Sequence, residues 1–163
     1  MSFVTTASVV AALLGSAMIA GVFFAFSSFV MKALTRMPSH EGIAAMHSIN
    51  VVVLNRSFLG AFMGTTLLSV LVAVLAIIGW GEASAPYFLA GALLYVIGTF
   101  LVTGLGNVPL NNKLAAVSAV EPDAIAVWEH YLDRWTTLNT IRTVAATAAA
   151  MMFTIGLIQD TGV

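Results

Sequence analysis

The chain contains no cysteine and very few charged residues. Without cysteine it has no disulfides, thiolate metal sites, iron–sulfur clusters or cysteine nucleophiles, and no motif for attaching haem covalently. Only 8% of its 163 residues are charged while 60% are hydrophobic, and the mean hydropathy of +1.02 leaves too little polar surface to cover a water-soluble protein. The net charge of −1 predicts no nucleic-acid partner, and no glycine-rich nucleotide fingerprint is present.

Four long apolar runs take up most of the chain. Each reaches or exceeds the roughly 20 residues that an α-helix needs to cross about 30 Å of hydrocarbon. Because the connections are short and small-residue faces such as Gly60 and Gly64 need helix partners, residues 1–163 are predicted to form a single transmembrane domain, an all-α integral membrane four-helix bundle. The predicted spans are Phe3–Met31, Ser57–Trp80, Pro86–Gly106 and Thr136–Ile158.

Lysine and arginine lie in or beside two windows, Lys32–Arg56 and Asn107–Arg134. These windows are the first and third connections, which lie on the same side of a four-span bundle, and their basic residues mark that side as cytoplasmic. Both termini are then predicted to lie outside. The protein as a whole is predicted to lie in the cytoplasmic (inner) membrane of a prokaryote. No basic residue precedes the first run, so it lacks the positive region of a cleaved signal peptide. The six basic residues are Lys32, Arg36, Arg56, Lys113, Arg134 and Arg142.

Histidine and asparagine gather at the same end of the chain's predicted bundle. Such side chains near or within membrane helices are costly unless they face protein or water. Their gathering predicts a polar pocket that opens to the cytoplasmic leaflet, although simple solvation in loops is the favoured explanation for His40 and Asn112. The full set is His40, His47, His130, Asn50, Asn55, Asn107, Asn111, Asn112 and Asn139.

Glu41–Phe58 has the pattern of an amphipathic helix that runs toward the second span. It begins after Ser39 and carries an acidic residue in its first turn, as helix starts commonly do. His47 and Asn50 share one face of this helix because they are three residues apart. Asn50 is flanked by apolar residues, so its amide is predicted to bond to another buried polar group.

The segment Gly104–Asn112 predicts a disturbance at the end of the third span. Pro109 disfavours the helical conformation at the residue before it and removes a backbone donor, so the span should bend or stop there. Carbonyl groups freed at this depth must be satisfied by protein or water. Asn107 and Asn111 are placed to do so while pointing into a cavity.

A stripe of polar and aromatic residues leads into the fourth span. Its spacings of three, four, four and three residues place all members on one helical face. An aromatic belt at the membrane boundary and a snorkelling arginine would explain part of it. An arginine one to two turns inside the span, however, needs a carboxylate, carbonyl groups or an anionic ligand. The stripe consists of Trp128, Tyr131, Trp135, Asn139 and Arg142.

These elements resemble the anthrone oxygenase-like family of small four-span membrane proteins. The resemblance extends from the first span to the fourth, and it rests on Gly21–Ser27 (GVFFAFS), Met46–Asn50 (MHSIN), Asn107–Asn111 (NVPLN) and the stripe from Trp128 to Arg142. It implies the oxidation of a polycyclic anthrone to an anthraquinone by dioxygen, the reaction assigned to fungal pathway members. Relatives commonly have glutamine where this chain has His47, so the resemblance implies no catalytic role for that histidine.

Such an oxidation is chemically feasible without a cofactor. The enolate of an anthrone is electron-rich enough to pass an electron to dioxygen directly, so the protein needs a base, an oxyanion site and a dry pocket. His47 or His130 is the candidate base, and Trp128, Tyr131 and Trp135 are candidate walls for a flat aromatic molecule. The candidate donors to the oxyanion are Arg142, Asn50, Asn107, Asn111 and Asn139.

Two other functions fit the same residues. A membrane protein without enzymatic activity could bind or transport a small amphipathic solute or lipid through the pocket, since broken helices and intramembrane arginine also occur in such sites. His47 and His130 could instead ligate a metal or haem, if they meet in the fold. The expected partners are a small apolar or aromatic molecule and membrane lipids. The sequence is also compatible with a homo-oligomer.

Overall fold

The computed structural model describes residues 1–121 and 123–161, and within these ranges it consists of helices and connections, with no strand. Four helices are long and apolar enough to cross a membrane. The predicted all-α, four-span architecture is therefore confirmed, and the chain is a membrane protein. The four spanning helices are Phe3–Thr35, Arg56–Ile78, Ala85–Ala115 and Ala124–Asp160.

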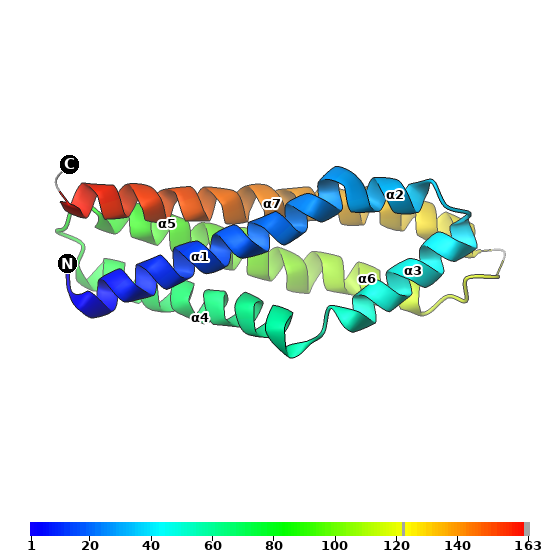
Figure 1. The fold of residues 1–163 in the computed structure, drawn as a ribbon, viewed down its shortest axis with the longest axis horizontal. Helices are drawn as coiled ribbons and strands as arrows, with labels where there is room; N and C mark the ends of the chain where they lie inside the picture. The colour runs from blue at the N-terminus through cyan, green and yellow to red at the C-terminus, as the bar shows by residue number, and fades with distance from the viewer. Residues whose placement is uncertain (122, 162–163) are drawn as a thin grey trace.

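The spanning helices lie side by side, and the first helix of the chain begins at the end of the bundle where the last helix ends (Figure 1). At the opposite end, α2, α3, α6 and the first turns of α7 extend the bundle (Figure 1); we call it the basic end because five of the six Lys and Arg residues lie on these elements, directly after α2 or at the start of α4. The π-helical segments are labelled η. In chain order the elements are α1 (Phe3–Ala25), η1 (Phe26–Val30), α2 (Met31–Thr35), α3 (Ser39–Val52), α4 (Arg56–Ile78), α5 (Ala85–Tyr95), η2 (Val96–Leu101), η3 (Thr103–Asn107), α6 (Val108–Ala115) and α7 (Ala124–Thr161).

The chain breaks between α3 and α4, so the prediction of one helix over Glu41–Phe58 is wrong at its carboxyl end. Helix α3 ends at Val52. Asn55 then adopts an extended backbone, and its Oδ1 accepts hydrogen bonds of 3.0 Å from the first two backbone N–H groups beyond Arg56. An asparagine that caps a helix in this way satisfies donors that have no partner within the helix. The cap starts α4 as a new helix in a different direction.

The disturbance predicted at Pro109 changes the hydrogen-bonding pattern without ending the helix. A proline inside an α-helix lacks an N–H and clashes with the carbonyl four residues earlier. Here η2 and η3 precede α6, and the Val108 N–H bonds to the Thr103 carbonyl five residues back. Pro109 then falls at the start of α6, where a missing donor is harmless. The third span consequently continues to Ala115, beyond its predicted end at Gly106.

Helix α7 begins twelve residues before the predicted fourth span. Its 38 residues correspond to about 57 Å at about 1.5 Å per residue. That length is nearly twice the thickness of the hydrocarbon core of a bilayer, which is about 30 Å. The first turns of α7, which carry Trp128 and Tyr131, therefore belong to the basic end rather than to the membrane core.

Two apolar clusters make up the interior. The larger is formed by α1, α4, α5 and α7 in the spanning part of the bundle, with Phe23, Phe62 and Tyr95 among its buried members. The smaller lies at the basic end, where Met46 and Trp128 pack among residues of α2, α3, α6 and α7. Four of the polar residues singled out in the sequence lie at the boundary between these clusters, namely Asn50, Asn107, Asn111 and Arg142.

The small residues contribute unequally to helix packing. Gly98 brings η2 close to α7, because a Cβ atom there would lie 2.5 Å from the Ala145 Cβ. Gly60 and Gly64 behave differently, since Cβ atoms added at either position would meet nothing within 4 Å. These two glycines therefore do not form the seam within the described bundle that their spacing suggests.

Candidate functional site

A cavity of about 270 Å³ lies between the two apolar clusters. Its walls come from α1, η1, α3, the α3–α4 connection, α4, η2, η3, α6 and α7. Its volume is close to the lower limit, about 300 Å³, of typical pockets for small molecules. Five of the residues singled out in the sequence line it, namely Asn50, Asn107, Asn111, Trp135 and Arg142.

Arg142 places a positive charge at the inner end of this cavity. Its side chain is only 4% exposed and forms no ion pair with any described residue. One terminal nitrogen donates to Thr103 Oγ1 at 3.1 Å, and the other donates to Asn139 Oδ1 at 2.7 Å. The guanidinium carbon also lies 4.0 Å from the centre of the Phe23 ring and 5.2 Å from that of Trp135. Hydrogen bonds and aromatic rings thus hold a charge that no carboxylate neutralises.

Asn139 fixes this arrangement from behind and does not line the cavity. Its Nδ2 donates to the Phe23 carbonyl and to Ser27 Oγ, both at 2.7 Å, while its Oδ1 accepts from Arg142. Ser27 belongs to η1, so the amide ties α7 to the place where the first helix widens into a π-helical turn. Such turns are frequent at functional sites. Asn139 is fully buried and acts by positioning Arg142.

Four buried polar atoms on the lining residues have no hydrogen-bond partner. Three are donors, Arg142 Nε, Trp135 Nε1 and Asn50 Nδ2, and one is an acceptor, Asn107 Oδ1. Leaving a buried polar group unpaired costs about 1–3 kcal/mol, so several around one cavity indicate that they are meant to meet a ligand or water. The excess of donors, one of them charged, favours a ligand with a negatively charged oxygen.

Two lining asparagines also connect the cavity to the basic end. Asn107 donates from Nδ2 to the Trp135 carbonyl at 3.2 Å, which joins η3 to α7. Asn111 accepts a hydrogen bond of 2.8 Å from the Tyr131 hydroxyl, and Asn50 lies beside the same hydroxyl. The hydrogen bond predicted from the Asn50 amide to another buried polar group is not formed, however, because Asn50 Nδ2 has no partner.

The aromatic walls of the cavity are mostly phenylalanine. Trp135 is the only member of the predicted Trp–Tyr–Trp wall that lines the described cavity. Trp128 and Tyr131 stack behind it, with ring centres 5.7 Å apart and Tyr131 5.9 Å from Trp135. The other rings come from α1, η1, α4 and η2, where the apolar runs gave no sign of their role. They are Phe23, Phe26, Phe58, Phe62 and Phe100.

Neither candidate base lines the cavity. The His47 ring lies against the basic-end cluster, with Nε2 2.8 Å from the Leu114 carbonyl, which joins α3 to α6. His130 is exposed and borders a separate surface hollow beside Lys113. Among the described residues, no group of three or more metal-ligating side chains comes together.

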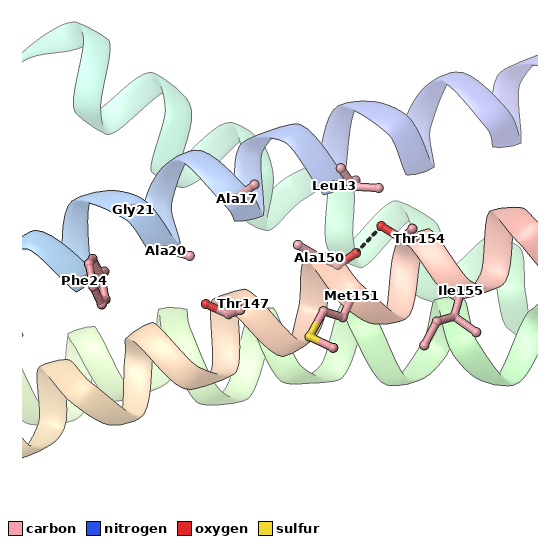
Figure 2. Close-up of a pocket in the computed structure, with 10 residues that line it drawn as sticks. All are labelled: Leu13, Ala17, Ala20, Gly21, Phe24, Thr147, Ala150, Met151, Thr154 and Ile155. Atoms are coloured by element: carbon pink, nitrogen blue, oxygen red, sulfur yellow. Dashed lines mark hydrogen bonds between the residues drawn. The ribbon is translucent and has the colours of Figure 1, made fainter.

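A larger groove of about 610 Å³ runs between α1 and α7 (Figure 2). Its walls are apolar or small, and its two hydroxyl groups, on Thr147 and Thr154, bond to carbonyl groups one turn back on α7. Figure 2 shows the Thr154 bond to Ala150. A groove without an unpartnered polar group has nothing to orient a substrate, so the smaller polar cavity is the candidate site.

Comparison with known proteins agrees with the resemblance seen in the sequence. The family model described as anthrone oxygenase matches residues 53–152, which is more than half of the chain. The matched region includes Asn107, Asn111, Trp135 and Arg142, and it begins after His47 and Asn50. No curated protein and no solved structure matches the chain. On the extent of the family match, the chain belongs to the anthrone oxygenase family.

Proposed function

We propose that this protein oxidises a flat, enolisable aromatic ketone of the anthrone type with dioxygen in the cavity between the two clusters. The observation that carries the proposal is the Arg142 guanidinium, buried without a carboxylate and with Nε unpartnered. Trp135 Nε1 and Asn50 Nδ2 add two more free donors at the same cavity. The family to which the chain belongs supports the choice of reaction.

The charge on Arg142 determines which form of the substrate the cavity favours. An unpaired charge buried away from water is unfavourable, and an anionic ligand at hydrogen-bond distance compensates it. The enolate oxygen of an anthrone is such an anion, whereas the ketone is neutral. Binding therefore favours the enolate and makes the substrate more acidic inside the cavity. Planar rings fit between Phe23, Phe62 and Trp135 by stacking.

The oxidation balances without a further reactant. The methylene C–H bond breaks, and its proton leaves while the electron pair enters the enolate. One electron passes from the enolate to dioxygen, which gives a substrate radical and superoxide. These two radicals join through a new C–O bond, and the resulting peroxide anion takes up a proton to become a hydroperoxide. Loss of the second proton from the same carbon then breaks the O–O bond, so that the ring carbon becomes a carbonyl. One oxygen atom enters the anthraquinone and the other leaves as water.

The lining supports stabilisation of the enolate more than abstraction of the proton. Among the described lining residues there is no imidazole and no carboxylate, and His47 is held by the Leu114 carbonyl. We assign the main role to Arg142 and its neighbouring donors, which stabilise the developing oxyanion. The proton then passes to a water molecule rather than to a dedicated base.

Oxygen uptake with anthrone tests this function. Arg142→Lys keeps the positive charge but loses the planar set of donors, so we expect uptake to fall about 100-fold or more, since removing one oxyanion donor costs about 100- to 1000-fold in rate. Arg134→Lys, on the same helix but exposed, is the matched control and should leave uptake unchanged. Equal rates for the two variants would contradict the role of Arg142. Binding of anthrone without oxygen uptake by the unmodified protein would favour a binding or transport function instead.

A further inference from the structure

One side of the cavity is lined by exposed apolar residues. We call this side the mouth, and it consists of Leu54, Leu59, Met63, Gly104 and Val108. Leu54 is 65% exposed, and Leu59, Met63 and Val108 are 37–42% exposed. The opposite side holds Arg142 and Asn107, which are almost completely buried. The cavity thus has a charged inner end and an apolar entrance.

The mouth lies where two helices lose contact with each other. Helix α4 packs along α5 and η2, but within the described chain it has no comparable packing against η3 or α6. Leu54, Leu59 and Met63 lie on the α4 side of this opening, and Gly104 and Val108 lie on the opposite side. A Cβ atom at Gly104 would meet nothing within 4 Å, so the entrance is clear at that position.

The mouth opens at the depth of the membrane rather than into bulk water. Helix α4 is a predicted span that begins at Arg56, and an arginine at a span's end reaches the headgroup region. Leu59 and Met63 lie about 5 and 10 Å further along the helix, at about 1.5 Å per residue. Val52 and Leu105 add exposed apolar surface next to the opening. An apolar patch of this kind is favourable against lipid and unfavourable against water.

From this geometry we propose that the cavity is loaded sideways from the bilayer, and that its substrate is a neutral aromatic molecule dissolved in the leaflet at the basic end. The inference rests on the function proposed above and adds the source and charge state of the substrate. The mouth contains no charged residue, and a charged molecule crosses such a passage only at high cost. The molecule therefore enters neutral and ionises beside Arg142.

A removable block at the mouth tests this route. The chain has no native cysteine, so Gly104→Cys provides a single thiol that a bulky maleimide can modify in detergent before reconstitution into phosphatidylcholine vesicles. The probe is 1-hydroxyanthraquinone, which is planar, neutral and not consumed, and which can quench the fluorescence of Trp135. Gly60→Cys is the control, because that glycine is also exposed and unobstructed but does not line the cavity.

Modification before and after loading should have opposite consequences. Maleimide on Gly104→Cys before loading should prevent quenching, and modification after loading should trap the probe and slow its release into empty vesicles about tenfold or more. The control should load and release the probe as the unmodified protein does. Release of the probe from the blocked, loaded variant at the control rate would overturn the lateral route, and so would failure of the unmodified protein to bind the probe.

A second pair guards against a folding defect at Gly104. Leu59→Cys at the mouth and Leu67→Cys, eight residues along α4 and 69% exposed, should reproduce the contrast. Anthraquinone-2-sulfonate, which carries a permanent charge, should also enter the unmodified protein at least about tenfold more slowly than the neutral probe; equal rates of entry would overturn the inference. Trapping of the probe without oxygen uptake from anthrone would refute the proposed oxidation alone.

Discussion

Asn139→Ala should destabilise the bundle by removing the contact that holds Arg142 in place. The amide makes three hydrogen bonds of 2.7 Å, to the Phe23 carbonyl, to Ser27 Oγ and from the Arg142 guanidinium. All three lie in the interior, where the side chain of Asn139 is completely buried. Alanine would leave a charged nitrogen of Arg142 without its partner and would remove one of the hydrogen bonds that the Phe23 carbonyl accepts.

The size of the effect follows from these three bonds. Hydrogen bonds between membrane helices average about 0.6 kcal/mol, with a maximum near 1.7 kcal/mol, and a bond to a charged group contributes about 1.5–3 kcal/mol. The free energy of unfolding should therefore fall by about 3 kcal/mol. Anthrone oxidation should fall as well, because Arg142 would no longer be fixed relative to the cavity.

Unfolding in mixed micelles with increasing sodium dodecyl sulfate, followed by circular dichroism, measures the loss. Thr147→Ala is the matched control on α7, since this residue is exposed in the groove between α1 and α7 and its hydroxyl bonds to the carbonyl one turn back. The control should change the free energy of unfolding by less than about 0.5 kcal/mol. If Asn139→Ala were as mild as Thr147→Ala, the tie between α7 and the π-helical turn of α1 would not stabilise the fold.

Two further changes test the roles assigned to neighbouring residues. His47→Gln should leave oxygen uptake within about twofold, because a glutamine amide can also donate to the Leu114 carbonyl; loss of activity would identify the histidine as a base. Gly98→Ala should lower the free energy of unfolding by about 1–3 kcal/mol, the usual effect of overpacking, because the new Cβ atom overlaps that of Ala145. Gly60→Ala, in open space, should lower it by less than about 0.5 kcal/mol in the same detergent titration.

The four spans could be predicted because the length and hydropathy of each apolar run show whether it can cross the hydrocarbon core of a membrane. The ends of the helices were less predictable, since they depend on local hydrogen bonds. Asn55 starts α4 through its own side chain, and a π-helical pattern carries the third span past Pro109. Neither feature changes hydropathy, so neither is visible in the apolar runs.

The candidate site could be predicted from the sequence only in part. Helical spacing places Trp128 and Arg142 on one face, but they are fourteen residues apart, or about 21 Å along a helix that rises about 1.5 Å per residue. Trp128 therefore lies in the basic-end cluster while Arg142 lies at the cavity. His130 is two residues from Trp128, about 200° around the helix, which explains why it faces outward.

The phenylalanine walls could not be identified before the structure. Phe23, Phe58 and Phe62 lie within or at the start of apolar runs that contain many other large hydrophobic residues. Which of them faces a cavity depends on how the helices rotate and cross, and that is decided by packing among several chain segments. Polar residues in the same helices were easier to identify, because each of them needs a partner at membrane depth.

The uninterrupted length of α7 separates two tasks within the protein. One rigid helix carries Arg142, to which the proposed function assigns the reacting oxygen, and the aromatic column that anchors the basic end, so the distance between them is set by helical geometry alone. The opposing walls come from separate shorter segments, the α3–α4 connection and η3. Substitutions there can change the size and shape of the molecule that is accepted while the reacting group stays at a constant position, and this division makes the fold a suitable starting point for redesigning substrate preference.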